Sequence, residues 1–139
     1  MKENTIVSLA DSNYFELLNE LIDSIQKFDQ SKSIAICILD AGLTKEQKKT
    51  LSLKVDEIKN AEWDIEVPGF KVRGKEWLKS LSLIHIWRCR FPKYKKYLWI
   101  DCDAWVQEWS SVELYFKACE DGKLGITQTM APGYRIMSK

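Results

Sequence analysis

The sequence lacks the paired cysteines and the phosphate-binding loops that mark several common classes of protein. Its four cysteines, Cys37, Cys89, Cys102 and Cys119, form no CxxC pair and are widely spaced, which argues against a zinc cluster and a redox dithiol. We expect them to be reduced thiols in a cytoplasmic protein. No Walker loop or GxGxxG motif occurs, so the sequence gives no support for ATP or dinucleotide binding.

Net charge of one sign and long apolar runs are also absent. Lys and Arg total 21 against 20 Asp and Glu, so no broad electrostatic field favours nucleic acid or anionic lipid. The N-terminal apolar stretch is interrupted by Asp11, Ser12 and Asn13 and lacks a signal-peptide core. No run approaches the roughly 20 apolar residues that span a bilayer. We expect a soluble, cytoplasmic protein with no transmembrane segment and no nucleic-acid partner, and peripheral attachment at the inner membrane stays open.

The sequence does contain a regular alternation of apolar runs and helical patterns. Its 139 residues, 45% of them apolar, suffice for one domain with a real core. Helical spacing predicts helices over 15–28, from 45 to about residue 60, and after Ser110. Apolar runs predict strands over 5–10, 33–39, 63–67, 97–100 and 124–127. This order predicts a Rossmann-like α/β fold, a mostly parallel sheet flanked by helices on both faces.

Helix starts are indicated by three pairs of residues with the spacing of a capping box. The pairs are Asn13 with Glu16, Thr44 with Gln47, and Ser110 with Glu113.

Three aspartates directly follow predicted strands. They are Asp11, Asp40 and Asp101. In open parallel sheets ligands bind beyond the carboxyl ends of the strands, because loops and helix N-termini gather there. We therefore expect these side chains on one rim of the sheet.

Asp101 and Asp103 form an acidic pair at the end of an apolar run. Side chains at i and i+2 of a strand emerge on the same face. Two close carboxylates repel each other unless a cation lies between them or one takes a proton. An all-oxygen site of this kind suits magnesium or manganese, with water and phosphate oxygens in the other positions. Such pairs also arise by chance, so two aspartates that merely end a strand and cap a turn remain an alternative.

Three motifs occur in order along the chain: LADSNY at 9–14, LDAG at 39–42 and LWIDCD at 98–103. Together they resemble the family-eight glycosyltransferases, the bacterial lipopolysaccharide galactosyl- and glucosyltransferases and their relatives. The resemblance runs from about residue 5 to residue 128 and implies the GT-A fold. It also implies a hexosyltransferase that moves a sugar from a UDP-sugar to a glycan or lipid-linked acceptor, with retention of configuration, in lipopolysaccharide or cell-surface glycan biosynthesis.

The same resemblance implies roles for individual residues. Donor binding falls to Ala10, Asp11, Asn13, Tyr14 and Asp101. Asp11 and Asn13 would bond the edge of the uracil and Tyr14 would stack on it, with packing at a helix start as the alternative for Tyr14. Asp101, near the ribose, and Asp103 would bind manganese, or magnesium in its place.

Other residues receive no catalytic role. Asp40 is expected to be a structural turn residue, and no catalytic nucleophile can be identified. Trp105 and Trp109 are expected to pack in the core.

The resemblance further implies that a part is missing. The family supplies a third metal ligand, a histidine, and most acceptor contacts from a segment well beyond the acidic pair. We therefore expect 1–128 to be a truncated nucleotide-sugar-binding GT-A half domain, 129–139 to be an incomplete tail, and the fragment to be inactive by itself.

Residues 81–90, LSLIHIWRCR, resemble the translation of an adapter used in DNA library preparation, with a stop codon read as Trp87. Neither Cys89 nor His85, the single histidine, is therefore assigned a function, and His85 is rejected as the missing metal ligand. Family members contact the donor from this region, so an artefact here replaces functional residues. Without His85 no Ser-His-Asp or Cys-His arrangement remains.

Two other functions stay open. One is a non-catalytic α/β nucleotide-binding or interaction domain, in which the carboxylates bind metal weakly or not at all. The other is a haloacid-dehalogenase-like phosphatase, which also uses Asp-x-Asp after a strand. Its motif continues to Thr or Val where this chain has Trp105, and it usually opens the fold.

Overall fold

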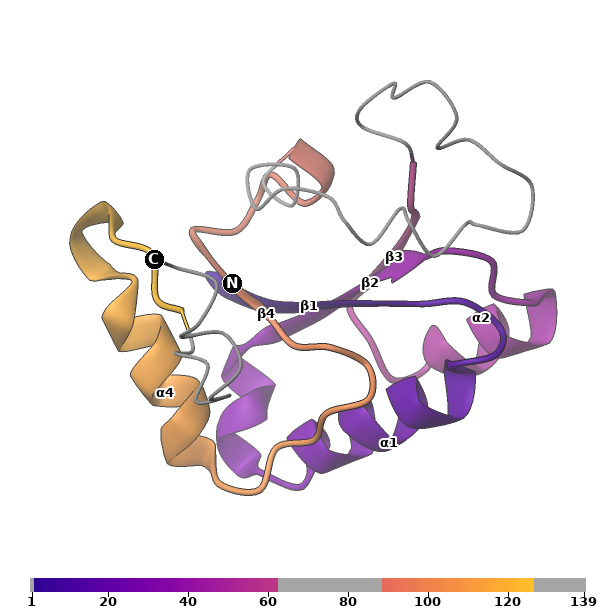
Figure 1. Ribbon diagram of the computed structural model, residues 1–139, viewed down its shortest axis with the longest axis horizontal. Coiled ribbons are helices and arrows are strands. Elements are labelled where there is room, and N and C mark those ends of the chain that lie inside the picture. Colours follow the sequence, from indigo (N-terminus) through magenta and orange to yellow (C-terminus); the bar gives the residue numbers. More distant parts are fainter. Residues whose placement is uncertain (1, 63–88, 127–139) are drawn as a thin grey trace, which may run out of the picture.

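The computed structural model describes residues 2–62 and 89–126, which form an open α/β fold (Figure 1). Strands β1 (Asn4–Ala10), β2 (Ala35–Asp40), β3 (Glu57–Asn60) and β4 (Lys96–Trp99) make one sheet in the order β3-β2-β1-β4. All three strand pairings are parallel. The described helices are α1 (Phe15–Gln26), α2 (Lys45–Leu51) and α4 (Trp109–Ala118), with short 3-10 turns at Asp29–Ser33 and Glu120–Gly122. The predicted parallel α/β architecture is confirmed.

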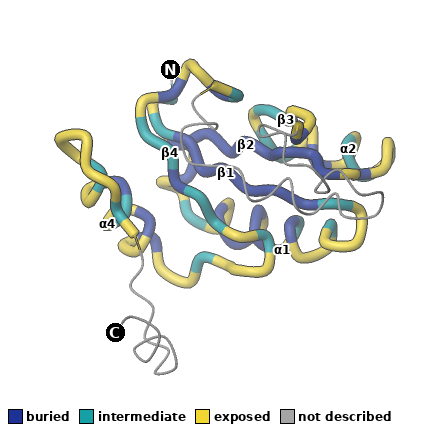
Figure 2. Tube along the Cα trace, turned by 45° about the horizontal axis from the view of Figure 1, so that its top comes forward, coloured by how far each residue is buried: buried dark blue, intermediate teal, exposed yellow. Residues whose placement is uncertain are grey.

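The three helices lie on one face of the sheet (Figure 1). Alternate residues of β1, Ile6 and Ala10, pack in that core with Leu18 and Ile22 of α1 and Val112 of α4. The strands are buried along most of their length, as the dark-blue stretches of Figure 2 show. Burial on both faces explains why β1 and β2 read as continuous apolar runs instead of alternating ones.

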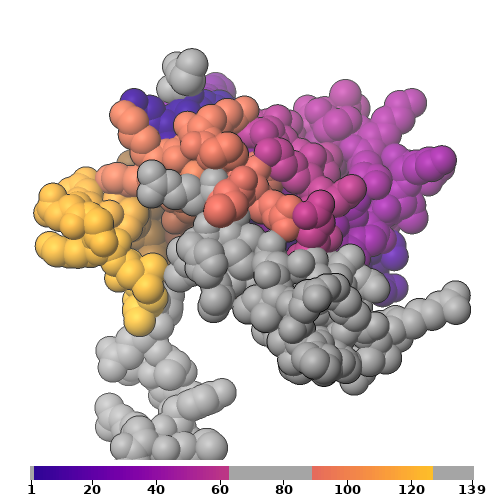
Figure 3. All heavy atoms as spheres, turned by 90° about the horizontal axis from the view of Figure 1, so that it is seen from above, coloured from indigo at the N-terminus to yellow at the C-terminus, as the bar shows by residue number. Residues whose placement is uncertain are grey.

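The opposite face of the sheet is covered by residues just before β4. Phe91 and Tyr94 are buried there against Val7 and Cys37. Figure 3 shows this orange segment lying against the magenta residues around β3. Ion pairs from Arg90 to Glu62 and from Lys93 to Glu57 hold it in place, at 2.5 and 2.8 Å. Among the described residues, the predicted helical cover is confirmed for one face by α1, α2 and α4, and residues 89–90 on the other face are also helical.

The predicted helix reaching about residue 60 is wrong, because α2 ends at Leu51 and β3 follows. Asp56 docks this segment on β2: its carboxylate accepts the Ile36 N–H and its own N–H donates to the Ile36 carbonyl, both at 2.9 Å. The strand predicted over 63–67 lies outside the described residues. Of the strand predicted over 124–127, residues 124–126 are described and are not in a strand.

One predicted capping box is confirmed. The Gln47 N–H donates to Thr44 Oγ1 at 3.2 Å, and the Thr44 N–H donates to Gln47 Oε1 at 2.9 Å. The box at Ser110 and Glu113 is wrong, because α4 already begins at Trp109 after an extended Glu108.

The box at Asn13 and Glu16 is also wrong. The residue before α1 is Tyr14, which makes no side-chain cap. Asp11 acts instead, since its Oδ1 accepts the N–H groups of Asn13 and Tyr14 at 2.8 and 3.2 Å. A carboxylate at the end of β1 thus satisfies donors in the turn that leads into α1.

Candidate functional site

The order of the strands reverses between β1 and β4. The chain runs outward from β1 to β2 and β3, then returns to place β4 on the other side of β1. Asp11 directly follows β1, and Asp101 follows β4 after one residue. In open parallel sheets, ligands bind outside the carboxyl ends of the strands where the order reverses. This edge is therefore the candidate site.

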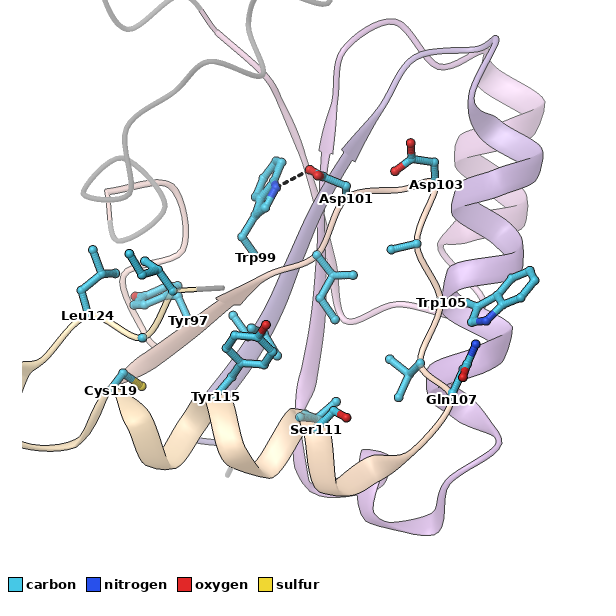
Figure 4. A pocket seen from close by; sticks show the side chains of 17 residues that line it. Tyr97, Trp99, Asp101, Asp103, Trp105, Gln107, Ser111, Tyr115, Cys119 and Leu124 are labelled. Atoms are coloured by element: carbon cyan, nitrogen blue, oxygen red, sulfur yellow. Dashed lines mark hydrogen bonds between the residues drawn. The ribbon is translucent and has the colours of Figure 1, made fainter. Parts of the chain in front are cut away.

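The acidic pair lies in the loop that leaves β4, and both side chains are exposed. The Trp99 indole N–H donates to Asp101 Oδ1 at 2.7 Å, which fixes that carboxylate. Figure 4 shows Asp103 farther along the same loop and outside this contact. Neither aspartate forms an ion pair within residues 2–62 and 89–126, so their negative charge is not neutralised there.

The thiol of Cys102, between the two aspartates in the sequence, is affected by several carboxylates. The pKa of its half-buried thiol is raised first by burial and then by the negative charges of Asp103, Asp101 and Asp11. Negative charges from the loops after β1 and β4 thus both raise the pKa of this thiol. In the described part of the chain, however, no three Asp, Glu, His or Cys side chains are grouped closely enough to hold a metal by themselves.

The motif at 9–14 contains residues that hold the backbone and residues whose side chains are exposed. Ala10 is buried at the end of β1, and its carbonyl accepts the Ala41 N–H at 3.0 Å. The Asp11 carboxylate is occupied by the turn into α1, where the Asn13 side-chain amide also approaches it at 3.3 Å. Asn13 is exposed and Tyr14 is 50% exposed, so Tyr14 is not a core residue.

Asp40 ends β2 at the same edge, but its carboxylate bonds within the turn that follows β2. Its buried carboxylate accepts the N–H groups of Gly42 and Leu43 at 2.8 and 2.6 Å and the Lys48 ammonium at 2.8 Å. Burial alone would raise the pKa of Asp40, but these bonds outweigh burial and hold the pKa below its usual value. The contacts agree with the predicted structural role. Gly42, at φ 134°, closes the turn beside Asp11.

The two tryptophans after the acidic pair have different environments. Trp109 is buried and its ring lies 5.7 Å from that of Phe28, as predicted. Trp105 is 63% exposed, so the prediction of core packing is wrong. Val106 packs against the core instead, and its N–H donates to Ser24 Oγ of α1 at 2.9 Å. Because only one residue of this loop packs inward, the loop has no periodic pattern from which its inward position could be predicted.

A pocket of about 720 Å³ borders the acidic loop (Figure 4). Asp101 and Asp103 lie at one end of it, and Tyr115 of α4 and residues 124–126 line the other. The volume lies within the range of small-molecule sites, roughly 300–1,000 Å³. Within the described ranges, no helix is both long and apolar enough to cross a membrane.

No protein-family model matches the sequence, and no curated protein gives a significant match. Among solved structures, the chain is similar to the galactosyltransferase LgtC in complex with donor and acceptor sugar analogs, with 20% identity and a TM-score of 0.48. That match covers 78% of this chain and 41% of that one. A structure of an active-site mutant of LgtC matches with the same identity and TM-score over 80% of this chain and 41% of its own. A similarity of this extent assigns no function.

Proposed function

We propose that the chain is the donor-binding part of a metal-dependent glycosyltransferase of the GT-A fold, which transfers a hexose from a UDP-sugar to a glycan or lipid-linked acceptor. The observation that carries the proposal is the position of Asp101 and Asp103. They follow β4 at the edge where the strand order reverses, and Asp11 follows β1, the strand that pairs with β4. A nucleotide diphosphate bound at such an edge needs its negative charge neutralised, and two adjacent carboxylates do this through a divalent cation.

The residues present fit manganese or magnesium. Both carboxylates are exposed, and neither has a cationic partner in the described residues. Asp103 forms no side-chain hydrogen bond with the described residues, while Asp101 keeps one oxygen beyond its bond to Trp99. Two carboxylates with the remaining positions taken by water and phosphate are the usual way in which proteins hold these ions. Bound there, the ion would stabilise the departing diphosphate.

The turn after β1 supplies the proposed nucleotide contacts. Asp11 holds that turn in shape, which leaves the Asn13 amide and the Tyr14 ring exposed at the start of α1. An amide is able to pair with the hydrogen-bonding edge of a base, and an aromatic ring stacks on its face. The Asp11 carboxylate would contribute to base binding indirectly, by holding the turn that presents Asn13 and Tyr14. Its Oδ1 is already occupied by the backbone N–H groups of these two residues.

Calorimetric titration of UDP, first with manganese and then with excess chelator, tests the proposal. We expect binding that requires manganese and falls at least about ten-fold, or 1.4 kcal/mol, in Asp103→Ala, because the variant removes a metal ligand and no core packing. Asp29→Ala is the matched control: it removes the same charge from a carboxylate that is 91% exposed and paired with Lys32. This control should bind UDP as the unmodified chain does.

Two results would contradict the proposal. One is manganese-dependent binding that Asp103→Ala leaves unchanged. The other is no binding, both in this chain and in a version whose residues 81–90 are restored from a related genomic sequence. Nucleotide binding without any hexose transfer in a full-length relative would favour the non-catalytic alternative.

A further inference from the structure

Trp105 borders a second pocket, which shares residues 105–107 with the first pocket but is not lined by the acidic pair. This pocket of about 610 Å³ lies between α1 and residues 105–107. Figure 4 shows the Trp105 indole and the Gln107 amide side by side, projecting toward α1. An exposed indole at the mouth of a pocket differs from an apolar residue scattered on the surface, because the pocket offers a bound molecule contacts on several sides.

The walls of this pocket are mixed in character. Phe28 and Val106 contribute apolar surface, and the other lining residues besides Trp105 are polar or charged: Glu20, Asp23, Ser24, Lys27 and Gln107. Asp23 is occupied by Lys54 at 2.6 Å. The side chains of Glu20, Lys27 and Gln107 form no hydrogen bond or ion pair within residues 2–62 and 89–126. They remain available as acceptor, donor and both, respectively.

The backbone that presents the indole is fixed. Ser24 is buried, accepts the Val106 N–H at 2.9 Å and donates its hydroxyl to the Leu21 carbonyl at 2.7 Å. The Val106 side chain packs against the main core. Trp105 therefore stands on a segment anchored to α1, which lowers the entropic cost of binding a ligand there.

We propose that this pocket is a saccharide subsite, in which a pyranose ring packs one face on the Trp105 indole. A pyranose has an apolar face of C–H groups and a rim of hydroxyls, and this pocket offers an aromatic plane beside available donors and acceptors. Glu20, Lys27 and Gln107 would bond the rim. The core of a protein interface is depleted in charged residues, so the charged lining disfavours a protein partner.

Assigning the subsite to the glycan acceptor rests on the proposed function. Trp105 is two residues from Asp103 in the same loop, so an acceptor held on the indole lies close to the proposed donor site. Saccharide binding by itself does not depend on that function, and the two are tested separately.

The test is titration of the 139-residue chain with a hexose disaccharide, followed through the indole N–H resonances of its 6 tryptophans. We expect the Trp105 resonance to shift saturably and the buried Trp109 resonance to stay in place. Trp105→Ala should weaken binding roughly ten-fold, a loss of about 1.4 kcal/mol. The matched control is Leu114→Ala, which removes a side chain that is 66% exposed on α4 and outside this pocket.

Three outcomes overturn the inference: no shift of Trp105, equal affinity in Trp105→Ala, or a Trp105 shift produced by raising the protein concentration without sugar. The last would make this surface a contact between two copies of the chain. A parallel titration with UDP and manganese separates the two proposals. Nucleotide binding without saccharide binding refutes the subsite alone. Saccharide binding without nucleotide binding, both in this chain and in the version with residues 81–90 restored, refutes the donor site alone.

Discussion

Replacing Asp40 with alanine should destabilise the fold without weakening the proposed metal site. The carboxylate is 7% exposed and accepts two backbone N–H groups of the turn after β2, from Gly42 and Leu43. A hydrogen bond to a charged group contributes about 1.5–3 kcal/mol. The Lys48 side chain is 40% exposed, so its ion pair adds less than about 1 kcal/mol. We expect a loss of about 3 kcal/mol in the free energy of unfolding.

Urea unfolding of the chain and of the Asp40→Ala variant measures this loss directly. The dependence of the unfolding free energy on urea should stay the same, because the variant exposes no additional surface on unfolding. Lys48→Met removes only the exposed partner and should cost less than about 1 kcal/mol. A loss below about 1 kcal/mol in Asp40→Ala would refute the assignment of Asp40 as the residue that holds this turn.

The same variant predicts how stability depends on pH. The pKa of Asp40 is lowered in the folded chain, so its contribution is complete above the pKa of the unfolded chain, about 3.9, and is lost as pH falls below that value through the folded pKa. The difference in unfolding free energy between the chain and Asp40→Ala should therefore be constant near neutral pH and shrink below about pH 4. A difference that shrinks between pH 6 and 8 instead would contradict the linkage to this carboxylate.

Two further substitutions test features of the fold. Thr44→Ala removes one half of the capping box and should cost about 1 kcal/mol in urea unfolding, whereas Thr50→Ala within α2 should cost less; equal losses would mean that the cap contributes nothing. Ser8→Ala should be neutral or stabilising in the same assay, because the Ser8 hydroxyl is buried with no hydrogen-bond partner in the described residues; a loss above about 1 kcal/mol would point to a bond that the structure does not record.

The sequence predicted the sheet better than the helix starts, for a physical reason. Strands β1 and β2 are buried on both faces, so nearly every residue in them has to be apolar. Such a run is recognisable in the sequence without knowledge of the tertiary structure. A capping box is only a spacing of polar residues, and it forms where no stronger acceptor is near. At α1 the Asp11 carboxylate takes the available N–H groups, and at α4 the helix begins one residue before the proposed cap.

The position of β3 and the exposure of Trp105 depend on contacts between residues that are far apart in the sequence, so local sequence patterns do not predict them. β3 forms because Asp56 bonds both backbone groups of Ile36, twenty residues earlier in the chain. Trp105 is exposed, while Val106, whose N–H is accepted by Ser24 of α1, packs against the core. Residues 105–107 border both the pocket beside the acidic pair and the proposed saccharide subsite. Asp103 and Trp105 leave the same short loop, but only Trp105 and the residues after it lie against α1.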